Sequence, residues 1–273
     1  SVLPMLLLIK LIKRKVNVTF FVLGLYASLP KYKIFAIFQS FYYFLLFLVA
    51  NNILFIGEGE YEHAINKNKL FKKKFHYAPF GIDLNFWKNN KNDIEFENKK
   101  GILFVGNDSN RSFETVIQLS RQLKEYEFTF VTNEILEKDV GSNVTLHNGS
   151  WGSPAISDNE LKELYQKSKL TIIPLKDTIQ PSGQSVALQS MAVGTPVLMT
   201  DIEGLWDKKN LINNENIVLL NSNNIEEWKS KILNLYPDSN NLSNISKNAI
   251  ECVVKYFDMD NFYKQIKNNI PDL

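Results

Sequence analysis

A polar loop that leads into a short helix is the part of this 273-residue chain best suited to binding an anion. The loop runs from Gln180 to Gln184, between an apolar segment at 170–174 and a helix pattern that ends at Gly194. The first turn of a helix leaves backbone N–H groups free, and the helix dipole adds positive potential there. We therefore expect a phosphate group to contact the residues at this helix start, which are Ser182, Gly183, Gln184 and Ser185.

A second stretch with suitable chemistry follows the apolar segment 101–106. Gly106 permits close approach of a ligand to the backbone, and Arg111 stands at the start of the next helix pattern. A guanidinium at that place can bind a diphosphate through two parallel hydrogen bonds. The alternative is a surface arginine paired with Asp108 or Glu114. We favour the phosphate role because a strand, a glycine and a loop together place the arginine there.

The elements that position these residues alternate between apolar strand patterns and amphipathic helix patterns. This alternation predicts an α/β fold with a parallel sheet in each half of the chain. The segments with strand character are 17–25, 52–56, 101–106, 128–133, 144–149, 170–174, 197–199 and 216–220. Gly194 should end the central helix in the left-handed conformation, and Pro196 should prevent the helix from restarting.

Composition excludes several classes of protein. The formal net charge is +2 with both signs mixed along the chain, which gives no case for nucleic-acid binding. The single cysteine, Cys252, cannot form an internal disulfide and is compatible with a reducing cytoplasm. No Cys/His cluster has metal-ligand spacing, so we expect neither a metal nor another cofactor. The chain begins at Ser1 within an apolar helix pattern, and we expect its N-terminal domain to be incomplete.

The run from Ser182 to Val197 resembles the donor-binding signature of family 4 glycosyltransferases (glycosyl transferases group 1), which have the GT-B fold. In that family a glutamate and a Gly-rich loop precede a second glutamate and the sequence Met-Ala-x-Gly-x-Pro-Val. The last part is intact here at 191–197. The two glutamates of this Glu-x7-Glu motif are replaced by Pro181 and Gln189, and Gln180 is an alternative stand-in for the first.

The resemblance implies two Rossmann-like domains that face a cleft. The N-terminal, acceptor-side domain would cover 1–90, and the nucleotide-sugar-binding domain 91–258. A helix within 259–273 would cross back to the first domain. It also implies transfer of a hexosyl group from a nucleoside-diphosphate sugar to a glycan or lipid-linked acceptor, as in bacterial cell-envelope polysaccharide synthesis. The reaction is expected to retain the anomeric configuration and to need no metal.

The resemblance further assigns roles to individual residues. Arg111 and Gln184 are the catalytic candidates, because they can stabilise charge that develops on the leaving diphosphate or contact the donor sugar. Gln189 keeps a carbonyl acceptor for the ribose. The expected donor-binding residues are Gly106, Arg111, Thr132, Asn133, Pro181, Ser182, Gly183, Gln184, Ser185 and Gln189.

A turn in the first half of the chain is the candidate for acceptor contact. It follows the strand 52–56 and contains Gly57, Glu58 and Glu60. The alternative for the two glutamates, which we favour, is stabilisation of the first turn of their own helix.

The most hydrophobic stretch, 33–49, is shorter than the roughly 20 residues of a membrane-spanning helix and is interrupted by Gln39 and Ser40. We expect a buried helix. A peripheral contact with the inner face of the membrane is the alternative, supported by the lysine run at 67–74. The expected location is the cytoplasm in either case.

Two alternatives to an active glycosyltransferase stay open. The first is a catalytically inactive GT-B-like protein that binds nucleotide sugars, since both glutamates of the motif are absent. The second is a sugar-nucleotide epimerase of the same general fold. We rank the epimerase last because the central loop supplies no carboxylate or histidine for acid–base chemistry.

Overall fold

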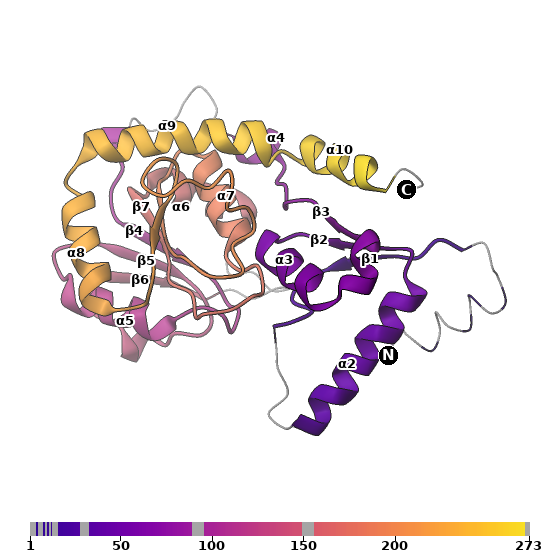
Figure 1. The fold of residues 1–273 in the computed structure, drawn as a ribbon. Coiled ribbons are helices and arrows are strands. Elements are labelled where there is room, and N and C mark those ends of the chain that lie inside the picture. The colour runs from indigo at the N-terminus through magenta and orange to yellow at the C-terminus, as the bar shows by residue number, and fades with distance from the viewer. Residues whose placement is uncertain are drawn as a thin grey trace.

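The computed structural model describes residues 16–27, 33–88, 96–148 and 156–270, with Pro4, Leu8, Lys10 and Ile12 as single positions before them. This part of the chain forms two lobes, each built on a parallel sheet (Figure 1). The α/β class with parallel sheets predicted from the sequence is therefore confirmed. The predicted domain boundary at residue 90 lies outside the described residues, as does the end of the predicted strand 144–149.

The smaller lobe holds a three-stranded sheet in the order β1-β2-β3. Its elements are β1 (Thr19–Val22), α2 (Lys33–Val49), β2 (Asn52–Phe55), α3 (Glu58–Lys67), η1 (Lys69–Lys74) and β3 (Phe75–Tyr77). One face of the sheet packs against α2, α3 and η1, with Phe47 and Phe55 fully buried between them. The other face receives α10 (Met259–Asn269), whose Ile266 packs with Leu54 of β2. The chain therefore returns to its first lobe after completing the second (Figure 1).

The larger lobe holds a six-stranded sheet in the order β6-β5-β4-β7-β8-β9. Its strands are β4 (Ile102–Val105), β5 (Phe128–Val131), β6 (Val144–His147), β7 (Leu170–Ile173), β8 (Val197–Thr200) and β9 (Val218–Leu220). Its helices are α4 (Leu84–Trp87), η2 (Phe96–Asn98), α5 (Phe113–Gln122), η3 (Glu137–Asp139), α6 (Asp158–Lys167), α7 (Gln184–Ala192), α8 (Ile225–Leu235) and α9 (Ser239–Tyr256). Every residue of β7 and β8 is buried, as expected for parallel strands covered on both faces.

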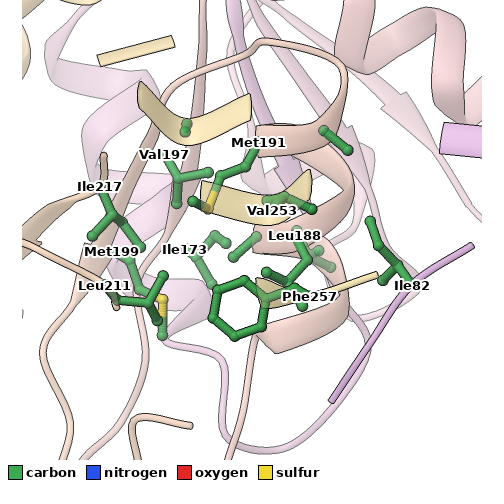
Figure 2. Close-up of a cluster of buried hydrophobic side chains, with 14 of the residues drawn as sticks. Ile82, Ile173, Leu188, Met191, Val197, Met199, Leu211, Ile217, Val253 and Phe257 are labelled. Carbon is green, nitrogen blue, oxygen red and sulfur yellow. The ribbon is translucent and has the colours of Figure 1, made fainter. Parts of the chain in front are cut away.

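Two clusters of buried side chains cover the two faces of the larger sheet. One lies beneath α5 and α8. The other packs α7 and α9 against β7 and β8, and Figure 2 shows Leu188 and Met191 of α7 in this cluster with Ile173, Val197 and Val253. Gly194 ends α7 with φ of +75°, as predicted. The centre of the lobe is therefore the strand–loop–helix–strand unit on which the sequence argument rests.

Helix α2 departs from the buried helix that the sequence favoured. Its C-terminal end is buried, but Ile37 and Phe38 are 69% and 63% exposed. Figure 1 shows its first turns projecting away from the sheet. Apolarity alone predicted burial, and the described part of the lobe contains too little structure to cover the whole helix. Within the described residues no helix has both the length and the apolar character needed to cross a membrane.

Candidate donor-binding site

The candidate site lies where the larger sheet changes direction. From β4 the chain moves outward to β5 and β6, then returns to β7 beside β4 and continues to β8 and β9. In parallel sheets of this topology, ligands bind in the crevice outside the carboxyl ends of the two central strands, and we refer to this region as the crevice. The loop after β4 carries Arg111, and the loop after β7 carries 180–184. An isolated antiparallel bridge between Arg111 and Leu175 joins the two loops.

The loop after β7 delivers the N-terminus of α7 to this crevice. Gly183 precedes the helix with φ of +76°, a conformation that residues with a Cβ rarely adopt. The first backbone bond of the helix runs from Ala187 to Gly183, at 2.9 Å. The N–H groups of Gln184, Ser185 and Val186 find no acceptor among the described residues. The predicted group of free backbone donors is therefore present.

Arg111 lies directly behind that helix start. It is only 3% exposed, and its Nε donates to the Val105 carbonyl over a long 3.4 Å. Gly106 makes room for the guanidinium, because a Cβ there would overlap Nε. A Cβ on Gly183 would lie 3.5 Å from Nη1, which places the guanidinium next to the helix start. Nη1 is 3.3 Å from Asp108 Oδ2, close enough for ionic attraction, yet its geometry gives no hydrogen bond to any described residue.

The surroundings of Arg111 make it a poor surface residue and a good anion ligand. Burial lowers the pKa of its guanidinium, and Asp108 opposes that change. An arginine keeps its charge even so. The buried Oε1 of Gln184 also lacks a partner within the described chain. A buried polar group without a partner costs about 1–3 kcal/mol, and such groups are informative where they persist. The fold therefore brings together both residues predicted to be catalytic, while their chemical roles stay predictions.

Gln189 lies further along α7 and is partly exposed. Its Oε1 accepts a hydrogen bond from the hydroxyl of Tyr165 on α6, at 3.3 Å. Tyr165 is fully buried, and the charge of Arg111 acts on its hydroxyl. Sequence reasoning gave Tyr165 no role at the site and missed this contact. The available signal was its hydroxyl, because a tyrosine on a buried helix face needs a polar partner.

Two asparagines that sequence reasoning also missed tie the loops of the crevice together. Asn110 Nδ2 donates to Ser182 Oγ at 2.8 Å and to Gln180 Oε1 at 3.3 Å. Asn107 Oδ1 accepts the backbone N–H of Asn133 at 2.7 Å. The signal in the sequence was the run of short polar residues directly after a strand, since such side chains often bond to nearby backbone.

The residues predicted to line a base pocket stand at the end of β5, on the same edge of the sheet. Thr132 is fully buried, and its Oγ1 accepts the N–H of Glu134 at 3.1 Å within the turn. Asn133 is exposed. The position of both residues agrees with a place beside the crevice, and their contact with a base stays a prediction. In the sequence Trp151 follows the strand pattern 144–149 and could also line a base pocket, but it lies outside the described residues.

The two lobes touch beside the site through backbone groups and small residues. Pro181 is buried, and a Cβ on Gly57 would lie 2.7 Å from its ring. Gly59 N–H donates to the Leu205 carbonyl at 3.3 Å, and a Cβ on Gly59 would overlap the carbonyl oxygen of Glu203. The loop of residues 201–208 in the larger lobe therefore packs directly on the turn that follows β2.

These contacts correct part of the acceptor-side prediction. Glu60 is fully buried, and its carboxylate accepts the N–H groups of Gly24 and Tyr26 at 3.0 and 3.2 Å. It holds the loop after β1 and therefore does not face an acceptor, although it does lie in the first turn of α3 as the alternative required. Gly57 is covered by Pro181. Glu58 stays partly exposed and accepts the N–H of Lys208 at 2.5 Å.

The described residues contain no cluster of three or more His, Cys, Asp or Glu side chains that could hold a metal ion. The Arg111 guanidinium and the N-terminus of α7 supply positive potential at this edge of the sheet. A site of this composition can hold a diphosphate and stabilise negative charge on it.

Comparison with known proteins agrees with this geometry. Several solved structures share the fold of the described chain. HepE of Anabaena, solved with UDP, is 14% identical, with a TM-score of 0.77 over 99% of this chain and 77% of that one. TarM is 12% identical, with a TM-score of 0.72 over 94% and 50%. Sucrose-phosphate synthase from Thermosynechococcus elongatus is 16% identical, with a TM-score of 0.66 over 85% and 61%.

The chain spans about half of TarM and about three fifths of the sucrose-phosphate synthase. No curated protein matches its sequence. At these identities the structural matches establish the fold, which is the GT-B fold of two facing α/β lobes, as predicted. A family model described as "Glycosyl transferases group 1" matches residues 85–251, more than half of the chain and the whole of the crevice in the larger lobe. The chain therefore belongs to the glycosyl transferases group 1 family.

Proposed function

We propose that this chain transfers a hexosyl group from a nucleoside-diphosphate sugar to a glycan or lipid-linked acceptor. The observation that carries the proposal is the pairing of a buried, incompletely bonded Arg111 with the free N-terminus of α7 at the switch point of the sheet. Both groups favour negative charge, and a leaving nucleoside diphosphate is where negative charge develops in glycosyl transfer. Family membership and the UDP and UDP-glucose complexes of HepE support this choice of donor class.

Each part of the crevice has a role in this proposal. The N–H groups of Gln184 and Ser185 bind the diphosphate, and Arg111 balances its charge from behind. Gln184 is also placed to contact the donor sugar. Gln189 binds the ribose, and the base lies toward Asn133 at the end of β5. The acceptor approaches from the smaller lobe, where Glu58 keeps partial exposure.

We propose that the reaction retains the anomeric configuration and proceeds without a metal. Retention follows from the family resemblance, and the anomer of the product, assigned by NMR, tests it. For the second point, the chain's own cation and helix dipole supply the charge stabilisation that a divalent ion supplies elsewhere. Turnover that is unchanged by EDTA would support the proposal, and turnover that EDTA abolishes would contradict it.

The test of the donor site is a calorimetric titration with a panel of nucleotide sugars, followed by an assay for nucleotide release. We expect Arg111→Ala and Gln189→Ala each to weaken donor binding by about 1–3 kcal/mol, the scale for a lost charged or buried hydrogen bond. Arg121→Ala is the matched control, because Arg121 is exposed on α5 and bonds only to the Asp139 carbonyl in the described structure. Unchanged affinity in both site variants would remove the assigned site.

The second candidate is a protein that binds the nucleotide sugar without turnover. The observation that favours it is the loss of both motif glutamates, to Pro181 at the lobe contact and Gln189 in the crevice. The same titration distinguishes the two candidates. Binding with nucleotide release supports a transferase, and binding without release in the presence of any acceptor supports the inactive binder.

For a lipid-linked acceptor we propose that α2 contacts an anionic membrane surface from the cytoplasmic side. Its exposed side chains are apolar except for Ser40 and the hydroxyl of Tyr42, and η1 packs beside it with three exposed lysines, Lys69, Lys72 and Lys73. Apolar side chains flanked by lysines are typical of helices that lie in the interface of anionic bilayers. We expect cosedimentation with phosphatidylglycerol vesicles and not with phosphatidylcholine vesicles. Replacement of the three lysines by glutamate should abolish cosedimentation, and equal binding to both lipids would contradict the charge argument.

A further inference from the structure

Tyr165 is held rigidly next to the proposed donor site. Its ring packs edge-on against Trp87 of α4, with centroids 6.0 Å apart and an interplanar angle of 76°. Its backbone carbonyl accepts the hydroxyl of Thr195 at 2.6 Å. The side chain is fully buried, so its hydroxyl cannot rely on solvent for a partner. The position of that hydroxyl is therefore set by the core and not by a ligand.

The hydroxyl of Tyr165 makes one hydrogen bond with the described residues, to Gln189 Oε1 at 3.3 Å. An amide oxygen can only accept, so the proton of the hydroxyl points to the glutamine oxygen.

This bond fixes which end of the Gln189 amide a ligand can meet. With Oε1 engaged by the buried tyrosine, the opposite end is Nε2, which makes no hydrogen bond with any described residue. Nε2 carries two N–H groups and has no acceptor capacity. Nε2 of Gln189, the guanidinium of Arg111 and the free backbone N–H groups at the start of α7 are then all donors.

We propose that Tyr165 is a positioning residue that turns Gln189 into a hydrogen-bond donor toward the ribose hydroxyl oxygens of the nucleotide. The inference rests on the proposed donor-binding function and adds which hydrogen bonds this chain uses to recognise the ribose. A glutamate at the same position would only accept, so it would require the ribose to donate. Here the amide donates, and the hydroxyl oxygens of the ribose accept.

The test combines a protein change with a ligand change. The ligands are UDP, GDP, ADP and CDP, each compared with its 2′,3′-dideoxy analogue by calorimetric titration. For the base that the wild type prefers, we expect removal of the ribose hydroxyls to weaken binding about tenfold, the effect of one good hydrogen bond. Tyr165→Phe should reduce that ratio to about two- to threefold, because the amide is then free to turn, and should leave the affinity for the dideoxy analogue unchanged.

Two further variants separate positioning from general support. Gln189→Leu should remove the dependence on the ribose hydroxyls altogether. Tyr236→Phe is the control, because its hydroxyl also makes a structural bond, to the N–H of Gly101 at 2.8 Å, but lies away from the crevice. We expect Tyr236→Phe to keep the full tenfold ratio of the wild type.

The outcomes separate this inference from the proposed function. If Tyr165→Phe weakens binding of the ribonucleotide and the dideoxy analogue equally, Tyr165 only supports the fold and the inference is overturned. An unchanged ratio overturns it as well. In both cases nucleotide binding by the wild type still stands. If the wild type binds none of the four nucleotides, the proposed function fails, and the inference fails with it.

Discussion

Replacing Arg111 with methionine should make the protein more stable and its donor site weaker. The guanidinium is 3% exposed, and burial already lowers its pKa, which shows that the charged form is disfavoured there. Methionine fills a similar volume and carries neither the charge nor the unpaired N–H. An arginine that mainly supports the fold would give the opposite result.

The magnitude follows from what the substitution removes. The ion pair with Asp108, whose side chain is 48% exposed, stabilises by about 0–1 kcal/mol, and the 3.4 Å bond to the Val105 carbonyl by less than about 1 kcal/mol. The unpaired Nη1 costs about 1–3 kcal/mol, and desolvation of the charge adds several more. The costs exceed the gains, so we expect Arg111→Met to raise the free energy of unfolding by about 1–4 kcal/mol, the range found when buried ion pairs are replaced by well-packed apolar residues.

The assay is urea denaturation followed by tryptophan fluorescence, because Trp206 and Trp228 are fully buried in the larger lobe and report its unfolding. The midpoint should rise with an unchanged denaturant slope. Calorimetry should show donor binding weakened by about 1–3 kcal/mol. Arg121→Met, at an exposed position, should change stability by less than about 0.5 kcal/mol and leave binding unchanged. A drop in stability with unchanged binding in Arg111→Met would refute the reasoning and make Arg111 a structural residue.

Three further predictions concern the smaller lobe and its contacts. Gly59→Ala should separate the lobes, because the new Cβ would overlap the carbonyl oxygen of Glu203. Small-angle scattering should then show a larger radius of gyration, and an unchanged radius would contradict the contact. Burial raises the pKa of Glu60, so the folded state holds the proton more tightly than the unfolded state. The free energy of unfolding therefore falls as pH rises from the pKa of the unfolded carboxyl group, near 4.5, to the pKa of the folded one. The measurement is the unfolding free energy of the wild type minus that of Glu60→Gln, followed as a function of pH. This difference should fall through that pH window and then level off, and a rise would show that the pKa of Glu60 is lowered by folding. Lys74→Met should destabilise the end of α2 by about 1–3 kcal/mol, because Nζ donates to the carbonyls of Phe47, Leu48 and Ala50 at 2.7, 3.1 and 2.7 Å. Hydrogen exchange of the α2 amides measures the loss of stability, and unchanged protection would argue against this role of Lys74.

The central unit of the larger lobe could be predicted because its information is local. The strands β7 and β8 are short apolar runs, and Gly183 and Gly194 mark the two ends of the helix between them. Each of these signals lies within a few residues of the element that it defines. The free helix start and the nearby arginine followed from the same local signals.

What could not be predicted depends on contacts between distant segments. The burial of Arg111 needs the space that Gly106 leaves and the packing of the loop after β7 against the loop after β4, and the role of Glu60 needs the loop after β1 to lie beside it. The bond between Tyr165 and Gln189 joins two helices whose individual patterns report only which face is apolar. Local sequence does not encode which residues of other elements complete a site.

The return of α10 to the smaller lobe has a consequence for how the protein is made. Leu54 on β2 is fully buried, and the side chains that cover its face include Ile266 and Ile270, which the ribosome adds only after the whole larger lobe. During synthesis that face of the first sheet stays open to water and to other nascent chains. The smaller lobe is translated first but completes its core last, and in that interval it is the part of the molecule most in need of a chaperone.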